Sequence, residues 1–97
     1  METYILKKSD RKNKRFVIIM NNMQHHFASD VGKTFIDSRT DKEKDAWIKR
    51  HRQDKNWNNK HSGIFFSRHL LWGKHKNLKK NIKDLEKLLN VKIKVEI

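Results

Sequence analysis

The sequence predicts an α+β fold in which an N-terminal antiparallel β-meander, two to three helices and a C-terminal strand share one small core. Three patterns predict it: short apolar runs before residue 30, helical spacing of apolar residues between residues 40 and 90, and strict alternation after residue 90. The 97 residues include no proline and only three glycines, without a Gly/Ser linker or a repeat. We therefore expect residues 1–97 to form a single small basic domain.

The meander is predicted from three strand patterns. Residues 4–8 form a short strand candidate, and residues 10–13 are polar turn material. Residues 16–20 are rich in β-branched side chains, which is typical of a buried strand. Asn21 and Asn22 tolerate the left-handed backbone of a hairpin turn, and residues 23–27 then alternate as a third strand with one apolar face.

Three helices follow. Thr40 and Glu43 have the spacing of a capping box, which predicts a helix over residues 41–53. Ser62 is expected to cap a second helix that ends at Trp72, with Gly73 in a left-handed C-terminal position. The third helix, residues 77–89, is predicted from an amphipathic stripe of Leu78, Ile82, Leu85, Leu88 and Leu89.

The end of the sequence predicts a strand that closes the sheet. Val91, Ile93, Val95 and Ile97 alternate strictly with charged residues. An isolated strand would leave its backbone groups without partners, so it is expected to pair with the N-terminal strands. The aromatic residues at helical spacing, Trp47, Phe65, Phe66 and Trp72, are expected in the core.

Charge is the main indication of function. The chain has 24 Lys and Arg residues against 11 Asp and Glu residues, a formal net charge of +13. A small domain needs only about 2 to 8 net charges to stay in solution, so a densely anionic partner is expected. Nucleic acid is the first candidate, and an acidic protein or a lipid surface is the second. The candidate nucleic-acid-binding residues are Lys12, Lys14, Arg15, Arg50, Arg52, Lys79, Lys80 and Lys83.

The remaining chemistry is sparse. Trp57 lies among Asn and Lys residues and is a candidate for base stacking, although a core position is the stronger expectation. The chain has no cysteine, and its six histidines match no metal-binding motif, so no catalytic residue, metal or cofactor is predicted. The N-terminus lacks the pattern of a signal peptide, and no apolar run is long enough to span a membrane.

The sequence also resembles a family of small basic proteins that large nucleocytoplasmic DNA viruses encode. The resemblance covers residues 12 to 84 and has three departures: Ala28 stands where the family has Gly, the segment around Phe35 is longer, and a Pro near Lys76 is missing. This family has no assigned function, so the resemblance implies a viral setting and no reaction. It rests on Phe27, Gly32, Asp37, Arg50-His51, Trp57, Gly63, Leu70-Leu71-Trp72 and Ile82.

The sequence therefore favours a non-enzymatic viral protein that binds nucleic acid, with duplex DNA preferred and no sequence recognition. It is expected in the virion, or in the cytoplasm or viral factory of the host cell, where it would help to condense DNA. The alternative is a minor capsid or cement protein that docks on an acidic protein lattice. A small nuclease is a more distant third. The sequence leaves the oligomeric state open.

Overall fold

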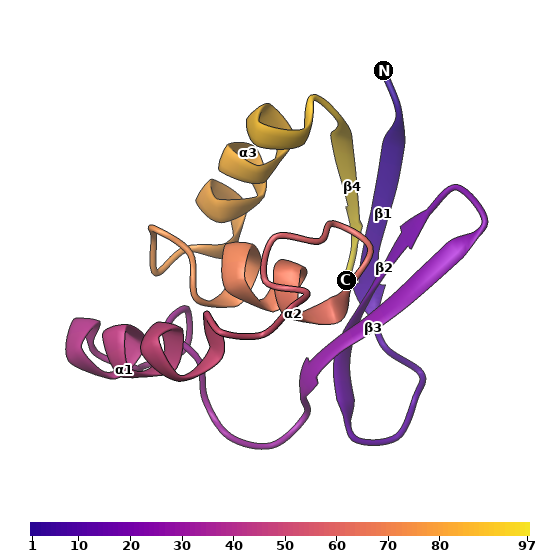
Figure 1. Cartoon of the computed structure of the whole chain (residues 1–97). Coiled ribbons are helices and arrows are strands. Elements are labelled where there is room, and N and C mark those ends of the chain that lie inside the picture. The colour runs from indigo at the N-terminus through magenta and orange to yellow at the C-terminus, as the bar shows by residue number, and fades with distance from the viewer.

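The structure, a computed structural model, describes residues 1–97 and contains one four-stranded mixed sheet with the order β3-β2-β1-β4 (Figure 1). Strand β1 pairs antiparallel with β2, β2 pairs antiparallel with β3, and β4 lies parallel to β1. This confirms the predicted α+β fold and the closing role of the last strand. The elements are β1 (Thr3–Lys8), β2 (Lys14–Met20), β3 (Met23–Ser29), α1 (Asp41–His51), α2 (Gly63–Phe66), the π-helical turn η1 (Ser67–Leu71), α3 (Leu78–Leu89) and β4 (Lys92–Glu96).

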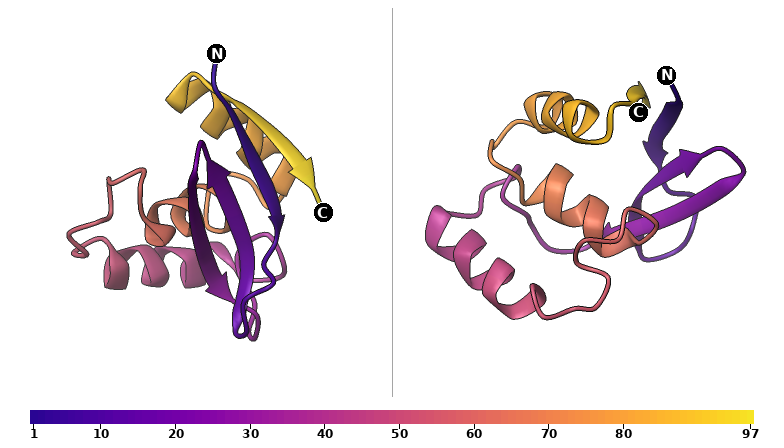
Figure 2. Two further views of the ribbon diagram at one scale, coloured as in Figure 1. Left: turned by 90° about the vertical axis from the view of Figure 1, so that its right-hand side faces the viewer. Right: turned by 45° about the horizontal axis from the view of Figure 1, so that its top comes forward.

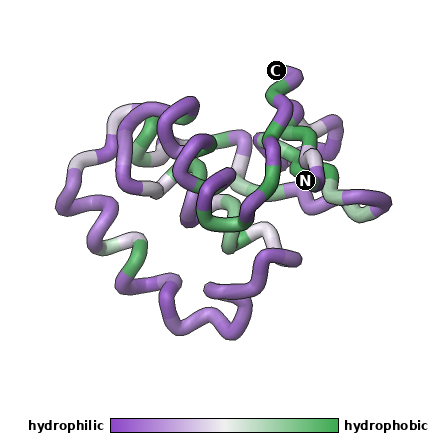
Figure 3. The backbone as a smooth tube through the Cα atoms, turned by 90° about the horizontal axis from the view of Figure 1, so that it is seen from above, coloured by the Kyte–Doolittle hydropathy of each residue, from purple (hydrophilic) through white to green (hydrophobic).

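The helices all lie on one side of the sheet, and the core fills the space between the two layers (Figure 2). The pairing register of the strands explains which of their side chains enter this core. Tyr4 pairs with Met20 and Leu6 with Ile18, so these four side chains point to the same face, toward the helices. The expected core positions Trp47, Phe65, Phe66, Trp72 and Leu85 are all buried. Hydrophobic segments of the chain are short and separated by hydrophilic ones (Figure 3).

Left-handed residues shape the turns of the meander. Asn13 ends the β1–β2 connection with a φ of 69°, and Asn21 opens the next turn with a φ of 55°. Asparagine tolerates this conformation better than most residues. Ala28 in β3 also has a positive φ, 65°. Alanine is strained in this left-handed conformation, because its Cβ crowds the backbone.

The capping box predicted for the first long helix is confirmed, and asparagines cap both ends of the other. Both hydrogen bonds of the capping box between Thr40 and Glu43 are present at the start of α1. Helix α1 ends at His51, two residues before the predicted end. At α3, the side chain of Asn77 accepts a hydrogen bond from the backbone N–H of Lys80, and Asn90 is left-handed at the C-terminal end.

The predicted second helix is the part of the fold that differs most. Only Gly63–Phe66 is α-helical, and the chain then widens into η1, where the N–H of Trp72 donates to the carbonyl of Ser67 at 3.1 Å. The wider winding lets the adjacent residues Leu70, Leu71 and Trp72 all be buried, which a regular α-helix with a single apolar stripe would not.

Ser62 is at the predicted N-cap position of this helix, but neither predicted cap forms the expected interaction. The hydroxyl of Ser62 donates to the carbonyls of Asn56 and Asn59 instead of accepting from the helix. Gly73 is not left-handed, since Gly32 is the only glycine with a positive φ. Gly73 is required for space: a Cβ there would lie 2.3 Å from the carbonyl oxygen of His69.

Asn81 fastens the end of η1 to α3. Its side chain is 1% exposed, and its amide nitrogen donates to the carbonyls of Leu70 and His75 at 3.0 and 2.8 Å. Its carbonyl oxygen accepts from the N–H of His75 at 2.9 Å. The buried polar group is thereby satisfied, and it holds the chain around Trp72 in place.

Candidate nucleic-acid interface

The predicted binding residues lie at three places in the fold. Lys12 and Lys14 are exposed at the β1–β2 connection and the start of β2, and Arg50 and Arg52 are exposed at the C-terminal end of α1. The third group, Lys79, Lys80 and Lys83, is exposed on α3.

Arg15 differs from the other predicted residues because it is already paired. Its guanidinium donates two hydrogen bonds to the carboxylate of Asp37, at 2.7 and 2.9 Å. This hydrogen-bonded pair, together with donors from Thr34, holds the pKa of Asp37 well below its usual range. Arg15 therefore ties the sheet to the segment before α1, and its charge is offset by Asp37 rather than free for a partner.

Trp57 is also engaged within the protein. The guanidinium of Arg68 lies 4.3 Å from the centre of its ring, and the ring of Trp47 lies 5.9 Å away. Arg68 also donates to the carbonyl of Trp57 and to the side chain of Asn58. The half-buried indole packs against the core, which is the position that the sequence favoured for it. A nucleic-acid base could stack on the ring only if Arg68 moved away.

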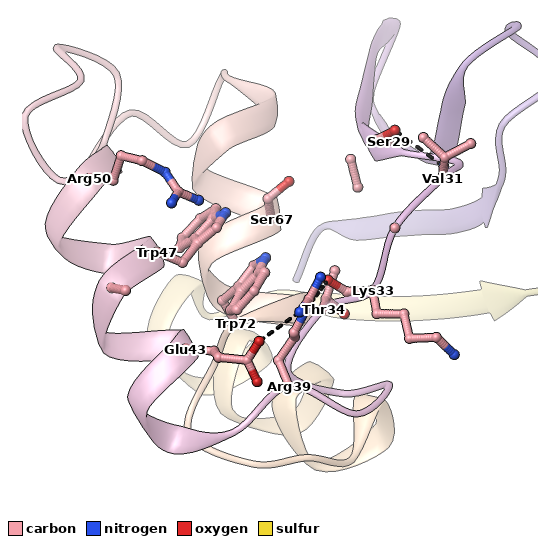
Figure 4. A pocket seen from close by; sticks show the side chains of 13 residues that line it. Ser29, Val31, Lys33, Thr34, Arg39, Glu43, Trp47, Arg50, Ser67 and Trp72 are labelled. Carbon is pink, nitrogen blue, oxygen red and sulfur yellow. Dashed lines mark hydrogen bonds and ion pairs between the residues drawn. The ribbon is translucent and has the colours of Figure 1, made fainter.

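A first cavity of about 540 Å³ lies between α1 and the segment that follows β3 (Figure 4). Trp47 and Trp72 form its inner wall, stacked with ring centres 4.9 Å apart and planes 7° from parallel. Three cationic side chains line it: Lys33, Arg39 and Arg50. We call it the tryptophan cavity.

Only one acidic residue lines this cavity. Glu43 accepts hydrogen bonds from the backbone of Thr40 and from Arg39, the latter at 2.6 Å, and both lower its pKa. Arg39 is thus offset by Glu43. Lys33 and Arg50 have no acidic partner and leave the cavity positively charged.

A second cavity of about 550 Å³ adjoins the first, because Gly32 and Lys33 line both. Lys8 and Lys14 of the β1–β2 hairpin line its other side, with the Arg15–Asp37 pair and Asp30. A strip of positive charge therefore runs from the hairpin to the end of α1. We call it the basic band and define it by Lys8, Lys14, Lys33, Arg39 and Arg50.

The basic band unites residues that lie far apart in the sequence. Lys14 and Arg50, both predicted, belong to it, and Lys12 and Arg52 flank them in the chain. The lysines of α3 line neither cavity; Lys83 lies instead beside Met1 and Lys92. Sequence reasoning missed Lys8, Lys33 and Arg39, since no motif marks them and only the fold of the segment around Gly32 brings them to the hairpin.

Ion pairing leaves most of the positive charge free. Three of the 24 Lys and Arg side chains form ion pairs with acids, Arg15, Arg39 and Lys94. Lys44 donates a hydrogen bond to the carbonyl of Gly73, and Arg68 donates one to the carbonyl of Trp57. The side chains of the remaining Lys and Arg residues form neither an ion pair nor a hydrogen bond within the protein.

The histidines pack as structural residues. His51 lies 4.5 Å from Trp47 and His69 lies 4.4 Å from Phe65, measured between ring centres. Burial lowers the pKa of His69 to about 4, with the nearby charge of Arg68 adding to it. His25 and His26 are both half-buried. No three His, Asp or Glu side chains gather closely enough to hold a metal ion.

Comparison with protein-family models, with curated proteins and with solved structures found no match to this chain. None of the helices combines the length and the apolar character that crossing a membrane requires.

Proposed function

We propose that this protein is a non-enzymatic nucleic-acid-binding protein that contacts the phosphate backbone, preferentially of duplex DNA, without reading the base sequence. The observation that carries the proposal is the basic band, in which Lys8, Lys14, Lys33 and Arg50 line two adjoining cavities without an acidic partner. Such cations neutralise phosphates and release counterions, whatever the base sequence.

The dimensions of the protein suit a short contact with a duplex. Its longest extent is 35 Å, which corresponds to about ten base pairs of B-DNA at 3.4 Å per step. The band and its flanking residues Lys12 and Arg52 supply about six free cations. Because each neutralised phosphate contributes about −0.9 to the slope, log K should fall with log salt at a slope near −5.

The experiment is a titration of a fluorescent duplex of about 20 base pairs with the protein at several salt concentrations between about 50 and 200 mM. Two duplexes of unrelated sequence should bind with the same affinity and the same steep slope. Flat salt dependence, or no binding at the lowest salt, would contradict the proposal.

Two triple variants with equal loss of charge locate the interface. The combined change Lys14→Gln, Lys33→Gln and Arg50→Gln should make the slope shallower by two to three units. The matched change Lys79→Gln, Lys80→Gln and Lys83→Gln, on α3, should alter it by less than about one. The reverse outcome would move the interface to α3, where sequence reasoning also placed binding residues.

The viral setting, in which the protein condenses DNA in the viral factory or travels in the particle, is part of the proposal and is supported by the sequence resemblance alone. An acidic protein lattice is the partner to test next if duplex DNA does not bind. In that case the same band variants should weaken binding to an acidic polypeptide such as poly-glutamate.

A further inference from the structure

Three nearly buried polar groups in the tryptophan cavity have no partner within the protein. The residues Trp47, Trp72 and Ser67 line the cavity and are only 9%, 8% and 7% exposed. Neither the two indole N–H groups nor the Ser67 hydroxyl forms a hydrogen bond with a protein atom. The only fully enclosed side-chain polar atom without a partner is Nε2 of His25, so these three groups remain open to the cavity.

Such groups normally find acceptors. Buried Trp N–H groups usually have a hydrogen-bond partner, and a serine within a helix commonly bonds to a carbonyl one turn earlier. Figure 4 shows both indole nitrogens directed to the same side, toward the space between α1 and the segment of Ser29 and Val31. The two rings are stacked, with centres 4.9 Å apart.

The charge of the cavity favours an anion as the acceptor for these three donors. Arg50 lines the cavity from the same helix as Trp47 and forms no ion pair with an acid (Figure 4). Lys33 also lines the cavity, but its ammonium points away from the two indoles in Figure 4. Glu43, the only acid present, is neutralised by Arg39. Two indole donors, one hydroxyl and a guanidinium match the several oxygens of a phosphate group.

We propose that the tryptophan cavity binds a phosphate monoester of a nucleotide, either at the 5′ end of a nucleic-acid strand or on a free mononucleotide. A phosphate within the backbone carries a sugar on both sides and reaches donors at this depth poorly, whereas a terminal phosphate can enter. The volume of about 540 Å³ lies in the range of small-molecule sites and leaves room for the attached sugar. This inference deepens the proposed function and rests on it for the strand-end ligand only.

The indole N–H signals in ¹H–¹⁵N NMR spectra test the site directly. The protein has three tryptophans, and Trp57 does not line the cavity, so its signal is an internal control that Trp57→Phe assigns. Inorganic phosphate and thymidine 5′-monophosphate, added at constant ionic strength up to about 10 mM, should shift the signals of Trp47 and Trp72 and leave that of Trp57 in place. Thymidine should shift none of them.

Matched variants separate this site from general charge. Arg50→Gln should weaken binding of the monophosphate about tenfold or more, because a charge-assisted hydrogen bond is lost. Arg52→Gln removes the same charge two residues away, outside the cavity, and should change binding less than about twofold. Equal effects of the two variants, or unmoved Trp47 and Trp72 signals at the highest phosphate concentration, would overturn the proposal.

Oligonucleotides distinguish the two sources of the phosphate. A short 5′-phosphorylated oligothymidylate that binds more tightly than its 5′-hydroxyl counterpart supports a strand-end site. Equal binding of the two, with the monophosphate still shifting both signals, supports the phosphate site and assigns it to free nucleotides. Salt-dependent binding of a 5′-hydroxyl duplex without any indole shift would reject the cavity site while leaving the proposed function intact.

Discussion

Asn81→Asp should destabilise the protein far more than an exposed Asn→Asp change. In the native protein, the amide nitrogen of Asn81 donates to the carbonyls of Leu70 and His75. A carboxylate in its place cannot donate, so it would leave both carbonyls unpaired and facing a negative oxygen. Only the bond accepted from the N–H of His75 would survive.

The size of the effect follows from those two bonds. A buried polar group left without a partner costs about 1 to 3 kcal/mol, so the two carbonyls together should cost about 3 kcal/mol. For a protein of 97 residues, each kcal/mol lowers Tm by about 4 to 8 °C, which gives a fall of about 12 to 24 °C.

Thermal unfolding followed by circular dichroism measures this directly. The control is Asn22→Asp, the same chemical change on an exposed turn residue without a side-chain hydrogen bond, which should shift stability by less than about 0.5 kcal/mol. Acid should narrow the gap between the two variants, because the introduced carboxyl can donate again once protonated. If both variants melted at the same temperature, the amide of Asn81 would not stabilise the junction of η1 and α3.

Three further predictions concern stability. Ala28→Gly should stabilise the fold by about 1 kcal/mol in urea denaturation, because a left-handed residue with a Cβ is strained; a loss of stability would show that the methyl packs better than it strains. Trp72→Ala and Leu85→Ala should each cost about 2 to 5 kcal/mol in thermal melts through lost burial and cavity formation, and unchanged melts would contradict the assigned core. Stability should fall as pH drops from about 6.5 toward 4, because the unfolded chain protonates His69 in this range and the folded protein, with a pKa of about 4, does not. His69→Phe should reduce that fall, and an equal fall in this variant would assign it to other groups.

Local patterns predict the parts of this fold that depend on near neighbours. The capping box of Thr40 and Glu43 was predictable because it acts within one helical turn. The pairing of the last strand was predictable from its strict alternation and unpaired backbone. Its parallel direction was not, because that depends on how the chain crosses from β1 to β4.

The site was only partly predictable, because it is assembled from distant segments. The sequence identified Lys14 and Arg50 as exposed cations, and both line the basic band. It also selected Arg15, since nothing in the local sequence shows that Asp37, 22 residues away, would neutralise it. Lys33 was missed for the opposite reason: it stands alone between apolar and polar residues, and only the fold places it between the two cavities.

The π-helical turn η1 links the core to the proposed phosphate site. In an α-helix with 3.6 residues per turn, side chains five residues apart point about 140° away from each other. The bond from the N–H of Trp72 to the carbonyl of Ser67 closes the turn over five residues, and it brings both side chains to the wall of one cavity. A regular helix would have separated the Ser67 hydroxyl from the Trp72 indole, and Gly73 and Asn81 stabilise the wider turn at its end. The feature that departs most from the sequence-based expectation is therefore the one that assembles the unpaired donors, as π-helical turns often do at functional sites.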